Sequence, residues 1–285
     1  MKQDIETVIT VITVVYNNVK DIEKTIKSVI EQTYKSIEYI VIDGGSTDGT
    51  LDIIKRYGNH ISYWTSEPDK GIYDAMNKGI VHAKGEWISF MNAGDCFTSN
   101  HVLSQMAINL TPDIDILRGN IIRIYPHFKV KSVGVTKQTP SLIDMFKNTF
   151  HHQATLIRSS LFKKYGLYSL DYKLCSDWKF FFECIVLHHV KSKYVDITVA
   201  RFQMDGASSN HSLLYNKEQE CYLKELYGEE LFNLLQELNI YRKSKIIKAY
   251  YRSIHYLTSH LSQKRFNQIL TLKRLLRSLL KMNVN

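Results

Sequence analysis

The segments SEPDKGIYDAMNKG (residues 66–79) and GEWISFMNAGD (residues 85–95) indicate the fold of this chain. Apolar residues recur at helical spacing over residues 72–83, which predicts a loop followed by an amphipathic helix that packs one face on a sheet. The apolar run at residues 87–91 predicts a buried central strand. Ligands of open α/β sheets bind just beyond the carboxyl ends of the strands, so we expect Asp95 to face such a crevice.

The segments before this stretch alternate between strand and helix signals. A β-branched run at residues 8–16 predicts a first strand buried on both faces, residues 38–43 predict the second strand, and a short third strand is expected at residues 60–64. Helical spacing at residues 22–30 and 50–57 predicts the helices between these strands. This β-α-β-α-β order implies a parallel sheet with right-handed crossovers.

The second half of the chain has a different character. A helix is expected near residues 101–110, and a strand at residues 115–125. Residues 128–210 are aromatic-rich and less periodic, and we interpret them as an irregular, substrate-facing half. Helical spacing returns at residues 213–238, and residues 243–281 have the pattern of a basic amphipathic helical region.

Composition and charge exclude several classes of protein. The 285 residues carry a formal net charge of +9, but 11 Lys and Arg residues and no acidic residue follow position 240, so the preceding part is close to neutral. This distribution argues against a nucleic-acid-binding core and for an interaction segment at the end. We find no secretory signal pattern and no apolar run long enough to span a bilayer. The four scattered cysteines suggest reduced thiols in a cytosolic protein.

Three aspartates are candidates for chemistry. Asp43 ends a strand before a Gly-Gly turn, where a carboxylate can accept hydrogen bonds from a uracil imide or a ribose hydroxyl. Asp95 can hold Mg²⁺ or Mn²⁺ together with substrate phosphates. Asp177 opens a strongly hydrophobic helix, where a half-desolvated carboxylate suits a general base for a sugar hydroxyl. Each has a structural alternative, which is turn chemistry for Asp43 and a helix N-cap for Asp95 and Asp177.

Other polar and aromatic residues lie near the predicted strand ends. Tyr16 follows the first strand and can lie flat against a base, although the same position suits a core residue. Lys70 and Gly71 can approach a phosphate, or they form an ordinary surface turn. The adjacent histidines 151–152 point in different directions and lack a third ligand at suitable spacing. A polar acceptor-binding loop is therefore a better interpretation of this segment than a zinc site.

Taken in order along the chain, these motifs resemble the family 2 glycosyltransferases of the GT-A fold, especially bacterial enzymes of polysaccharide assembly. The matching segments are ITVVYN (12–17), SVIEQTY (28–34), EYIVIDGGSTDGT (38–50), SEPDKGIYDAMNKG (66–79), AKGE (83–86), NAGD (92–95), HQA (152–154) and SDW (176–178). Each motif alone is weak, whereas the ordered series over roughly residues 8–210 is specific.

The resemblance implies a fold and a reaction. The fold is α/β, with a mostly parallel, Rossmann-like sheet flanked by helices and a helical C-terminal extension. Residues 1–110 would form the nucleotide-sugar-binding half, residues 111–212 the acceptor-binding half of the same domain, and residues 213–285 the extension. The reaction is an inverting transfer of a sugar from a nucleotide-diphosphate sugar to a hydroxyl of a glycan or lipid-linked saccharide in cell-surface polysaccharide synthesis. Among the nucleotide sugars, a UDP-sugar is the expected donor.

The resemblance also implies roles for matching residues. Asp177 would take the proton from the acceptor hydroxyl, and Asp95 would bind the metal–diphosphate through Mn²⁺ or Mg²⁺. The expected donor-binding residues are Thr13, Tyr16, Asn17, Asp43, Lys70, Gly71 and Asn77. The expected acceptor-binding residues are His152, Gln153 and Trp178. Two positions depart from the family pattern: NAGD offers one acidic ligand where two are common, and Gly44 stands where a second acidic residue is frequent.

The basic C-terminal region lies outside the matched motifs. Its interspersed apolar and basic residues predict helices that lie on an anionic membrane surface, or else that pack on the enzyme body or on a second copy in a homo-oligomer. We expect a cytoplasmic protein, peripheral on the inner face of the plasma membrane, with no nucleic-acid partner. The rival interpretations are a sugar-1-phosphate nucleotidyltransferase, whose glycine-rich basic loop is missing after the first strand, and a basic-tailed module that binds membrane or nucleic acid.

Overall fold

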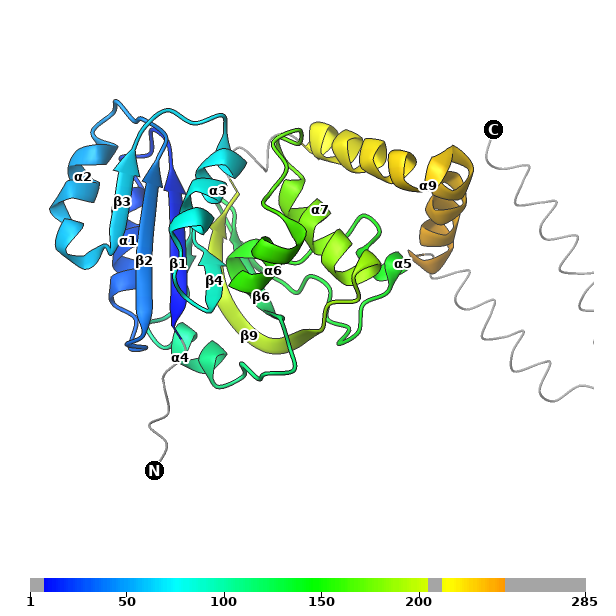
Figure 1. Cartoon of the computed structure of the whole chain (residues 1–285), viewed down its shortest axis with the longest axis horizontal. Coiled ribbons are helices and arrows are strands. Elements are labelled where there is room, and N and C mark those ends of the chain that lie inside the picture. The colour runs from blue at the N-terminus through cyan, green and yellow to red at the C-terminus, as the bar shows by residue number, and fades with distance from the viewer. Residues whose placement is uncertain (1–7, 205–211, 244–285) are drawn as a thin grey trace, which may run out of the picture. The chain divides into compact units, whose positions relative to one another are not determined.

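The computed structural model describes residues 8–204 and 212–243 and shows an α/β fold built on a nine-stranded sheet (Figure 1). The strand order is β3-β2-β1-β4-β8-β6-β9-β5, with β7 paired to β6. The chain divides into two compact units, one ending at Gly228 and the next beginning at Glu229. The first unit contains the sheet and every residue assigned above to the site.

The N-terminal half of the sheet is parallel, as its sequence predicts. It consists of β1 (Ile9–Val15), β2 (Ile37–Asp43), β3 (Tyr63–Ser66) and β4 (Trp87–Phe90). Strand β1 pairs in parallel with β2 and β4, and β2 pairs in parallel with β3. Val15 is in register with Asp43, and Asp43 with Ser66, so these strands deliver their carboxyl ends to one edge.

The second half of the sheet mixes strand directions. Its strands are β5 (Cys96–Phe97), β6 (Ile116–Ile124), β7 (Lys129–Ser132), β8 (Thr155–Arg158) and β9 (Ser192–Gln203). Strand β8 is antiparallel to β4 and β6, whereas β9 runs parallel to β6 and pairs with β5 in the antiparallel sense. Since β8 is antiparallel to β4, residues just before β8 lie beside residues just after β4.

Helices cover both faces of the parallel strands. The helices among the described residues are α1 (Ile22–Ile30), α2 (Thr50–Arg56), α3 (Ile72–His82), α4 (Val102–Ala107), α5 (Leu142–Met145), α6 (Ser159–Tyr165), α7 (Ser176–Phe182) and α9 (Ser212–Lys243), with shorter turns η1 (Gly58–His60), η2 (His152–Ala154) and the π-helical η3 (Glu183–Leu187). Ile9 and Val11 of β1 share a core with Ile22 of α1, whereas Ile12, on the opposite face, contacts Gly79 of α3. All seven residues of β1 are buried, which explains its unbroken apolar pattern.

Three features differ from the sequence predictions. The third strand begins at Tyr63, because residues 58–60 form the short helix η1. On α2 the sequence predicts that Leu51 and Ile54 face the sheet, whereas the structure buries Ile53 and Ile54 and leaves Leu51 half-buried. Residues 128–210 are far from irregular, since they contain the 12-residue strand β9, which is only partly buried and therefore lacks a clean alternating pattern.

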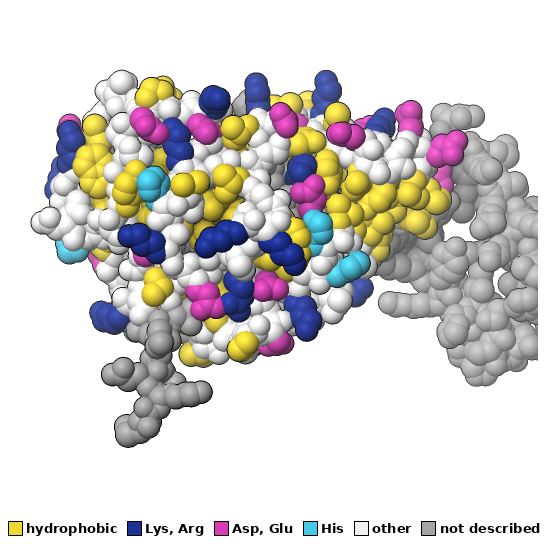
Figure 2. Space-filling view, in the orientation of Figure 1, with side chains coloured by type: hydrophobic (Ala, Val, Ile, Leu, Met, Phe, Trp, Pro, Cys, Tyr) yellow, Lys and Arg dark blue, Asp and Glu magenta, His cyan; other side chains and the backbone are white. Residues whose placement is uncertain are grey.

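The C-terminal part is described only as far as residue 243. Helix α9 consists of two helices joined at Gly228, whose φ of 77° is non-helical. The amphipathic region predicted at residues 243–281 lies almost wholly outside the described residues. Within the part that is described, no helix is long and apolar enough to cross a membrane. On the face shown in Figure 2, Lys and Arg side chains lie among Asp and Glu side chains.

Candidate active site

The carboxyl ends of β2 and β3 form one wall of the candidate site. Asp43, the last residue of β2, is fully buried, and its Oδ1 accepts a hydrogen bond from Ser46 Oγ (2.5 Å). Its Oδ2 accepts hydrogen bonds from the Ser46 backbone N–H (3.0 Å) and from Ser66 Oγ (2.6 Å). The carboxylate therefore ties the loop after β2 to the end of β3, and its assignment to the nucleoside remains a prediction.

The loop after β1 is tied to the same wall. Asn17 has a left-handed backbone (φ 46°), which asparagine adopts more readily than most residues. Its N–H donates to Ser46 Oγ (2.7 Å), and its Oδ1 accepts from the Thr47 N–H (2.9 Å). This arrangement leaves the side chain of Tyr16 65% exposed, which excludes the alternative of a core tyrosine.

The segment that leads into α3 is open. Gly71 is the N-cap of α3 with φ 119°, and a side chain at this position would meet nothing within 4 Å. The neighbouring Lys70 has an exposed side chain, while its backbone N–H donates to Asp74 Oδ2 (3.0 Å). Open space beside an ammonium group at a helix N-terminus can admit a phosphate.

Asp95 lies in a tight turn after β4. Gly94 has φ 103°, a conformation that favours glycine, and Thr25 Oγ1 accepts from the Gly94 N–H (3.0 Å) and donates to the Asp95 carbonyl (2.8 Å). Strand β5 follows, so the helix N-cap alternative for Asp95 is excluded. Asp95 is 5% exposed, and burial raises the pKa of its carboxyl to about 7 despite the opposing influence of His152 and Gln153.

Asp177 occupies the first turn of α7, after the N-cap residue Cys175, so it is not the cap itself. Its Oδ1 accepts a hydrogen bond from the Tyr73 hydroxyl (2.8 Å), and its Oδ2 lies 3.2 Å from His152 Nδ1. Burial alone would raise the pKa of Asp177, but the hydrogen bonds from His152 and Tyr73 outweigh burial and hold the pKa below its ordinary value. Asp177 is therefore an oriented carboxylate at neutral pH.

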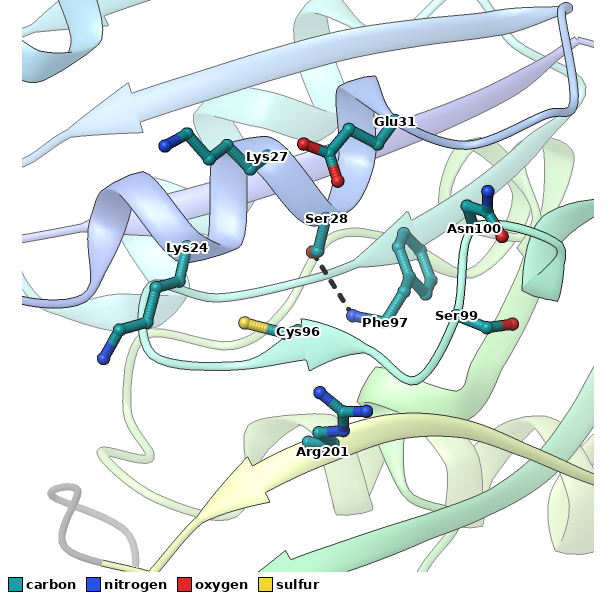
Figure 3. A pocket seen from close by; sticks show the side chains of 9 residues that line it. All are labelled: Lys24, Lys27, Ser28, Glu31, Cys96, Phe97, Ser99, Asn100 and Arg201. Atoms are coloured by element: carbon teal, nitrogen blue, oxygen red, sulfur yellow. Dashed lines mark hydrogen bonds between the residues drawn. The ribbon is translucent and has the colours of Figure 1, made fainter.

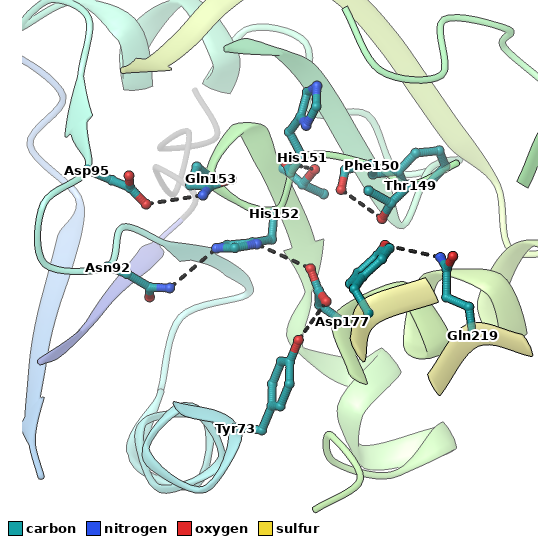
Figure 4. A network of polar contacts seen from close by, with 12 residues as sticks. Tyr73, Asn92, Asp95, Thr149, Phe150, His151, His152, Gln153, Asp177 and Gln219 are labelled. Atoms are coloured by element: carbon teal, nitrogen blue, oxygen red, sulfur yellow. Dashed lines mark hydrogen bonds and ion pairs between the residues drawn. The ribbon is translucent and has the colours of Figure 1, made fainter. Parts of the chain in front are cut away.

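The dipeptide His152–Gln153 joins the two carboxylates (Figure 4). His152 contacts Asp177, while Gln153 Nε2 donates to Asp95 Oδ2 (3.1 Å). On its other side, His152 Nε2 lies 3.3 Å from Asn92 Nδ2. If the amide donates to Nε2, the ring hydrogen is on Nδ1 and is donated to Asp177. The antiparallel pairing of β8 with β4 accounts for this meeting of distant segments.

His151 does not join this network of side chains. Its Nε2 lies 3.1 Å from Ser132 Oγ and accepts from the Gly134 N–H at 3.3 Å, and burial lowers its pKa to about 4. The two neighbouring histidines thus have different partners. Over residues 8–204 and 212–243, no three His, Cys, Asp or Glu side chains gather in a way that could hold a metal ion.

A divalent cation at Asp95 would need further oxygen ligands. Asn92 lies three residues earlier in the same turn, and its Oδ1 is buried without a hydrogen-bond partner among the described residues. Carboxylate and amide oxygens suit Mg²⁺ and Mn²⁺, which proteins often hold with one or two side chains plus substrate phosphates. Asp95 and Asn92 therefore fit a cation whose shell a phosphorylated substrate completes.

Three of the expected site residues lie behind the site instead of lining it. Thr13 is fully buried and its Oγ1 donates to the Met91 carbonyl (2.7 Å). Both polar atoms of the Asn77 amide bond the backbone of Tyr168, at 2.8 and 3.0 Å. Trp178 is fully buried, and its Nε1 donates to a backbone carbonyl in α5 (3.2 Å). Because these three side chains are buried, their exposure does not support the prediction that they contact a ligand directly.

Sequence reasoning missed several residues that the fold brings to the site. Tyr73 contacts Asp177, and Asn92 contacts His152. Ser46 and Ser66 donate hydrogen bonds to Asp43. Tyr73 had one usable signal: a tyrosine on the buried face of an amphipathic helix needs a partner for its hydroxyl. The identity of that partner, 104 residues away, has no local signal.

A separate hollow of about 340 Å³ lies between α1, β5 and β9 (Figure 3). Its lining residues are Lys24, Lys27, Ser28, Glu31, Cys96, Phe97, Ser99, Asn100 and Arg201. Lys24 pairs with Asp21 (2.9 Å) and Lys27 with Glu23 (3.2 Å). Because these exposed lysines already have carboxylate partners, we assign no ligand to this hollow.

Sequence comparison relates the chain to known transferases. The model of the family described as glycosyl transferase family 2 matches residues 10–166. An uncharacterised glycosyltransferase of Mycobacterium tuberculosis is 35% identical over 179 residues, which cover 60% of this chain and 66%, just under two thirds, of that relative. A PGL/p-HBAD biosynthesis glycosyltransferase of Mycobacterium bovis is 31% identical over 188 residues, which cover 64% of this chain and 72% of that protein.

Solved structures show the same fold. The 1–349 fragment of S. aureus TarS, in complex with UDP-GlcNAc, superimposes with a TM-score of 0.64 at 18% identity, covering 82% of this chain and 72% of that fragment. The mannosyltransferase PcManGT of Pyrobaculum calidifontis, in complex with GDP-Man and Mn²⁺, gives 0.62 at 14% identity, covering 95% and 80%. Identities this low establish the GT-A fold alone.

Proposed function

This chain belongs to glycosyl transferase family 2, and from that premise we propose that it is an inverting transferase, which moves a sugar from a UDP-sugar to a hydroxyl of a glycan or lipid-linked saccharide. The observation that carries this assignment is the pair of carboxylates joined by His152–Gln153, namely the buried Asp95 and the partly buried Asp177, whose side chain is 13% exposed. Direct displacement requires one group beside the leaving diphosphate and one that accepts the acceptor's proton.

We place the donor along the carboxyl edge of the parallel strands. The nucleoside would lie at the loops after β1 and β2, where the exposed ring of Tyr16 and the loop held by Asn17 and Asp43 offer a wall. The diphosphate would lie near Lys70 and Gly71, where the chain is open. The similar structures contain UDP-GlcNAc and GDP-Man, which supports a nucleotide sugar as the ligand class.

A metal ion fits the same site. Asp95 and Asn92 are the residues that would hold Mn²⁺ or Mg²⁺, together with the donor's diphosphate. When bound, such an ion neutralises the charge that the leaving diphosphate develops. The complex of PcManGT with GDP-Man and Mn²⁺ supports this choice of ion.

Asp177 is the group that we assign as general base. The proton of the acceptor hydroxyl moves to a carboxylate oxygen of Asp177, the acceptor oxygen bonds the anomeric carbon, and the bond from that carbon to the diphosphate oxygen breaks. Tyr73 and His152 orient the carboxylate and keep it ionised, although stabilising the anion also makes it a weaker base. Attack from the face opposite the diphosphate inverts the anomeric configuration.

Asp177→Asn tests this assignment. The variant keeps the shape of the side chain but cannot accept the proton, so transfer should fall by about 10²- to 10⁴-fold while the dissociation constant for UDP stays within a few-fold of wild type. The release of UDP measures the rate of transfer, and calorimetry measures the dissociation constant. Asp171→Asn, at an exposed position in the loop before α7, is the matched control and should retain transfer. Full transfer by Asp177→Asn would remove Asp177 as the base.

We extend the assignment to the cellular setting that the sequence predicts. Residues 1–110 would bind the donor, residues 111–212 the acceptor, and residues 213–285 would dock the enzyme at the inner face of the plasma membrane, where cell-surface polysaccharide is made. The relative named for PGL/p-HBAD biosynthesis supports a biosynthetic acceptor. Family membership weighs against the rival nucleotidyltransferase and the pure binding module.

A further inference from the structure

Building on the UDP-sugar function proposed above, we propose that Asp69 presents the carboxylate oxygen that recognises the donor base, and that this base is uracil. Asp43, the aspartate expected to do so from sequence, is fully buried and accepts hydrogen bonds from Ser46 and Ser66 on both oxygens. A ligand N–H would have to displace one of these donors. Another acceptor at the same edge is therefore needed.

Asp69 supplies that acceptor from the loop after β3. Its Oδ1 accepts a hydrogen bond from the Gly71 N–H (2.8 Å), which orients the carboxylate. Its Oδ2 has no hydrogen-bond partner within the described part of the chain, and the residue is partly exposed. The oxygen reaches across to the loop after β2, because a Cβ on Gly44 would collide with Asp69 Oδ2.

An aromatic surface lies beside this oxygen. The same Cβ position on Gly44 is only 3.3 Å from Tyr16 Cδ2, so the ring of Tyr16 and the carboxylate of Asp69 meet above Gly44. Tyr16 is 65% exposed, and its loop is fastened by the Asn17 contacts with Ser46. A flat base can stack on such a ring while an N–H on its edge points to the oxygen.

The donor and acceptor pattern of the bases selects uracil. Uracil has one ring N–H, at N3, which matches the single unpartnered oxygen of Asp69. Cytosine has an unprotonated N3 and would oppose the carboxylate with a lone pair. Guanine offers two adjacent donors, which suit a carboxylate with both oxygens available, whereas Oδ1 of Asp69 is occupied by Gly71.

The experiment measures dissociation constants of UDP, N3-methyl-UDP, CDP and GDP by calorimetry with Mn²⁺ present. For the wild-type chain we expect UDP to bind at least about tenfold tighter than the other three, since N3-methyl-UDP and CDP lack an N–H at N3 and GDP presents two donors to one free oxygen. In Asp69→Asn, the amide oxygen keeps the Gly71 N–H, so the amide NH₂ takes the place of Oδ2 and faces the base. The affinity for UDP should then fall by about tenfold or more, and the affinity for CDP should rise relative to that for UDP.

Two further variants separate recognition from folding. Glu67→Gln removes a neighbouring, exposed negative charge and should keep the wild-type order of ligands. Gly44→Ala keeps Asp69 but pushes its oxygen away, so it should reduce the preference for UDP over N3-methyl-UDP. A purely structural role for Asp69 would weaken all four ligands equally.

The outcomes distinguish this inference from the proposed function. Equal binding of UDP and N3-methyl-UDP by the wild type, or an unchanged preference for UDP over CDP in Asp69→Asn, would overturn the role of Asp69 while leaving a UDP-sugar enzyme. A wild-type preference for GDP would overturn the choice of uracil. Absence of binding by any nucleoside diphosphate would overturn the proposed function and this inference with it.

Discussion

At the scale of single residues, two aspartates of one site are driven in opposite directions by their surroundings. Asp95 is buried with few hydrogen-bond donors, and burial raises its pKa to about 7. Asp177 is also desolvated, yet hydrogen bonds from His152 and Tyr73 bring its pKa below the ordinary value. The environment of Asp95 favours the neutral carboxyl unless a cation binds, whereas the environment of Asp177 favours a carboxylate that is ionised at neutral pH.

Removing the Tyr73 hydroxyl should change the pH profile of transfer. Burial raises the pKa of Tyr73 well above its ordinary value, so the hydroxyl stays protonated and donates to Asp177 at neutral pH. Tyr73→Phe removes a donor that stabilises the carboxylate, which should raise the pKa of Asp177 and move the acid limb of kcat/KM to higher pH. A higher pKa by itself makes Asp177 a stronger base, so the fall in kcat that we expect, about tenfold, comes from the lost orientation of the carboxylate.

The matched control for this variant is Tyr168→Phe. The ring of Tyr168 lies 5.6 Å from that of Tyr73, and its hydroxyl is buried without a hydrogen-bond partner in the described structure. Loss of an unpartnered hydroxyl should leave the pH profile unchanged and the protein equally or more stable. Identical profiles for wild type and Tyr73→Phe would show that the Tyr73 contact does not tune Asp177.

Asp95→Asn should stabilise the metal-free protein at alkaline pH. Because the pKa of Asp95 is raised in the fold, to about 7, its favourable contribution is complete below the unfolded pKa of about 4 and is lost as pH rises through 7. Asparagine carries no such penalty, so the free energy of unfolding at pH 8 without metal should rise by on the order of 1 kcal/mol or more, with little gain near pH 4. Chemical denaturation across this pH range measures the difference.

Metal should reverse this order of stability. If Mn²⁺ binds at Asp95, saturating Mn²⁺ raises the melting temperature of the wild type and leaves that of Asp95→Asn unchanged. Asp52→Asn, an exposed position on α2, is the matched substitution and should behave as the wild type does. Equal stabilisation of Asp95→Asn by Mn²⁺ would place the cation elsewhere.

At the scale of secondary-structure elements, α3 organises the site. Its N-cap Gly71 borders the open donor edge, and Tyr73 in its first turn reaches Asp177. One turn later Asn77 clamps the Tyr168 backbone, and Gly79 lies directly against Ile12 of β1. One helix therefore connects the central strand, the donor edge and the proposed base, so its depth on the sheet determines the geometry of the site.

Gly79→Ala tests how closely α3 must approach the sheet. Alanine favours a helix over glycine by about 1 kcal/mol, but its Cβ would lie 2.5 Å from Cγ2 of the fully buried Ile12. The clash should dominate and destabilise the protein by about 1–3 kcal/mol in urea denaturation. Val81→Ala, at a 70% exposed position of the same helix, should change stability by less than about 0.5 kcal/mol. A Gly79→Ala variant as stable as the wild type would mean that α3 can shift freely.

At the scale of the whole molecule, the chain separates catalysis from its excess charge. The site lies in a part of the chain with balanced charge, whereas the basic excess follows position 240. A polybasic segment attracts anionic lipid by about 1 kcal/mol per nearby basic residue. The predicted division of labour is therefore between an enzyme body and a docking segment.

The membrane prediction concerns this basic segment. The protein should co-sediment with anionic liposomes at low salt and be released at high salt, and replacing Lys273, Arg274, Arg277 and Lys281 with Gln should reduce binding severalfold. Replacing Lys55 and Arg56, exposed on α2, is the control and should have little effect. Equal binding to neutral liposomes would contradict an electrostatic mechanism.

The sequence by itself determined the parallel half of the fold and the candidates Asp95 and Asp177. Buried β-branched strands and amphipathic helices are local, periodic patterns, and ligands of open α/β sheets bind beyond the carboxyl ends of the strands. The turn and the helix start that carry these aspartates are equally local.

Only the tertiary structure decided which side chains meet. The pairing of β8 with β4 places His152–Gln153 between the two carboxylates, and α3 carries Tyr73 to Asp177, 104 residues away. It also showed that the side chains of Asn77 and Trp178 are buried and bond the protein's own backbone, and that both oxygens of Asp43 are occupied. Contacts of this kind depend on strand pairing and packing between distant segments, for which a single sequence holds no periodic signal.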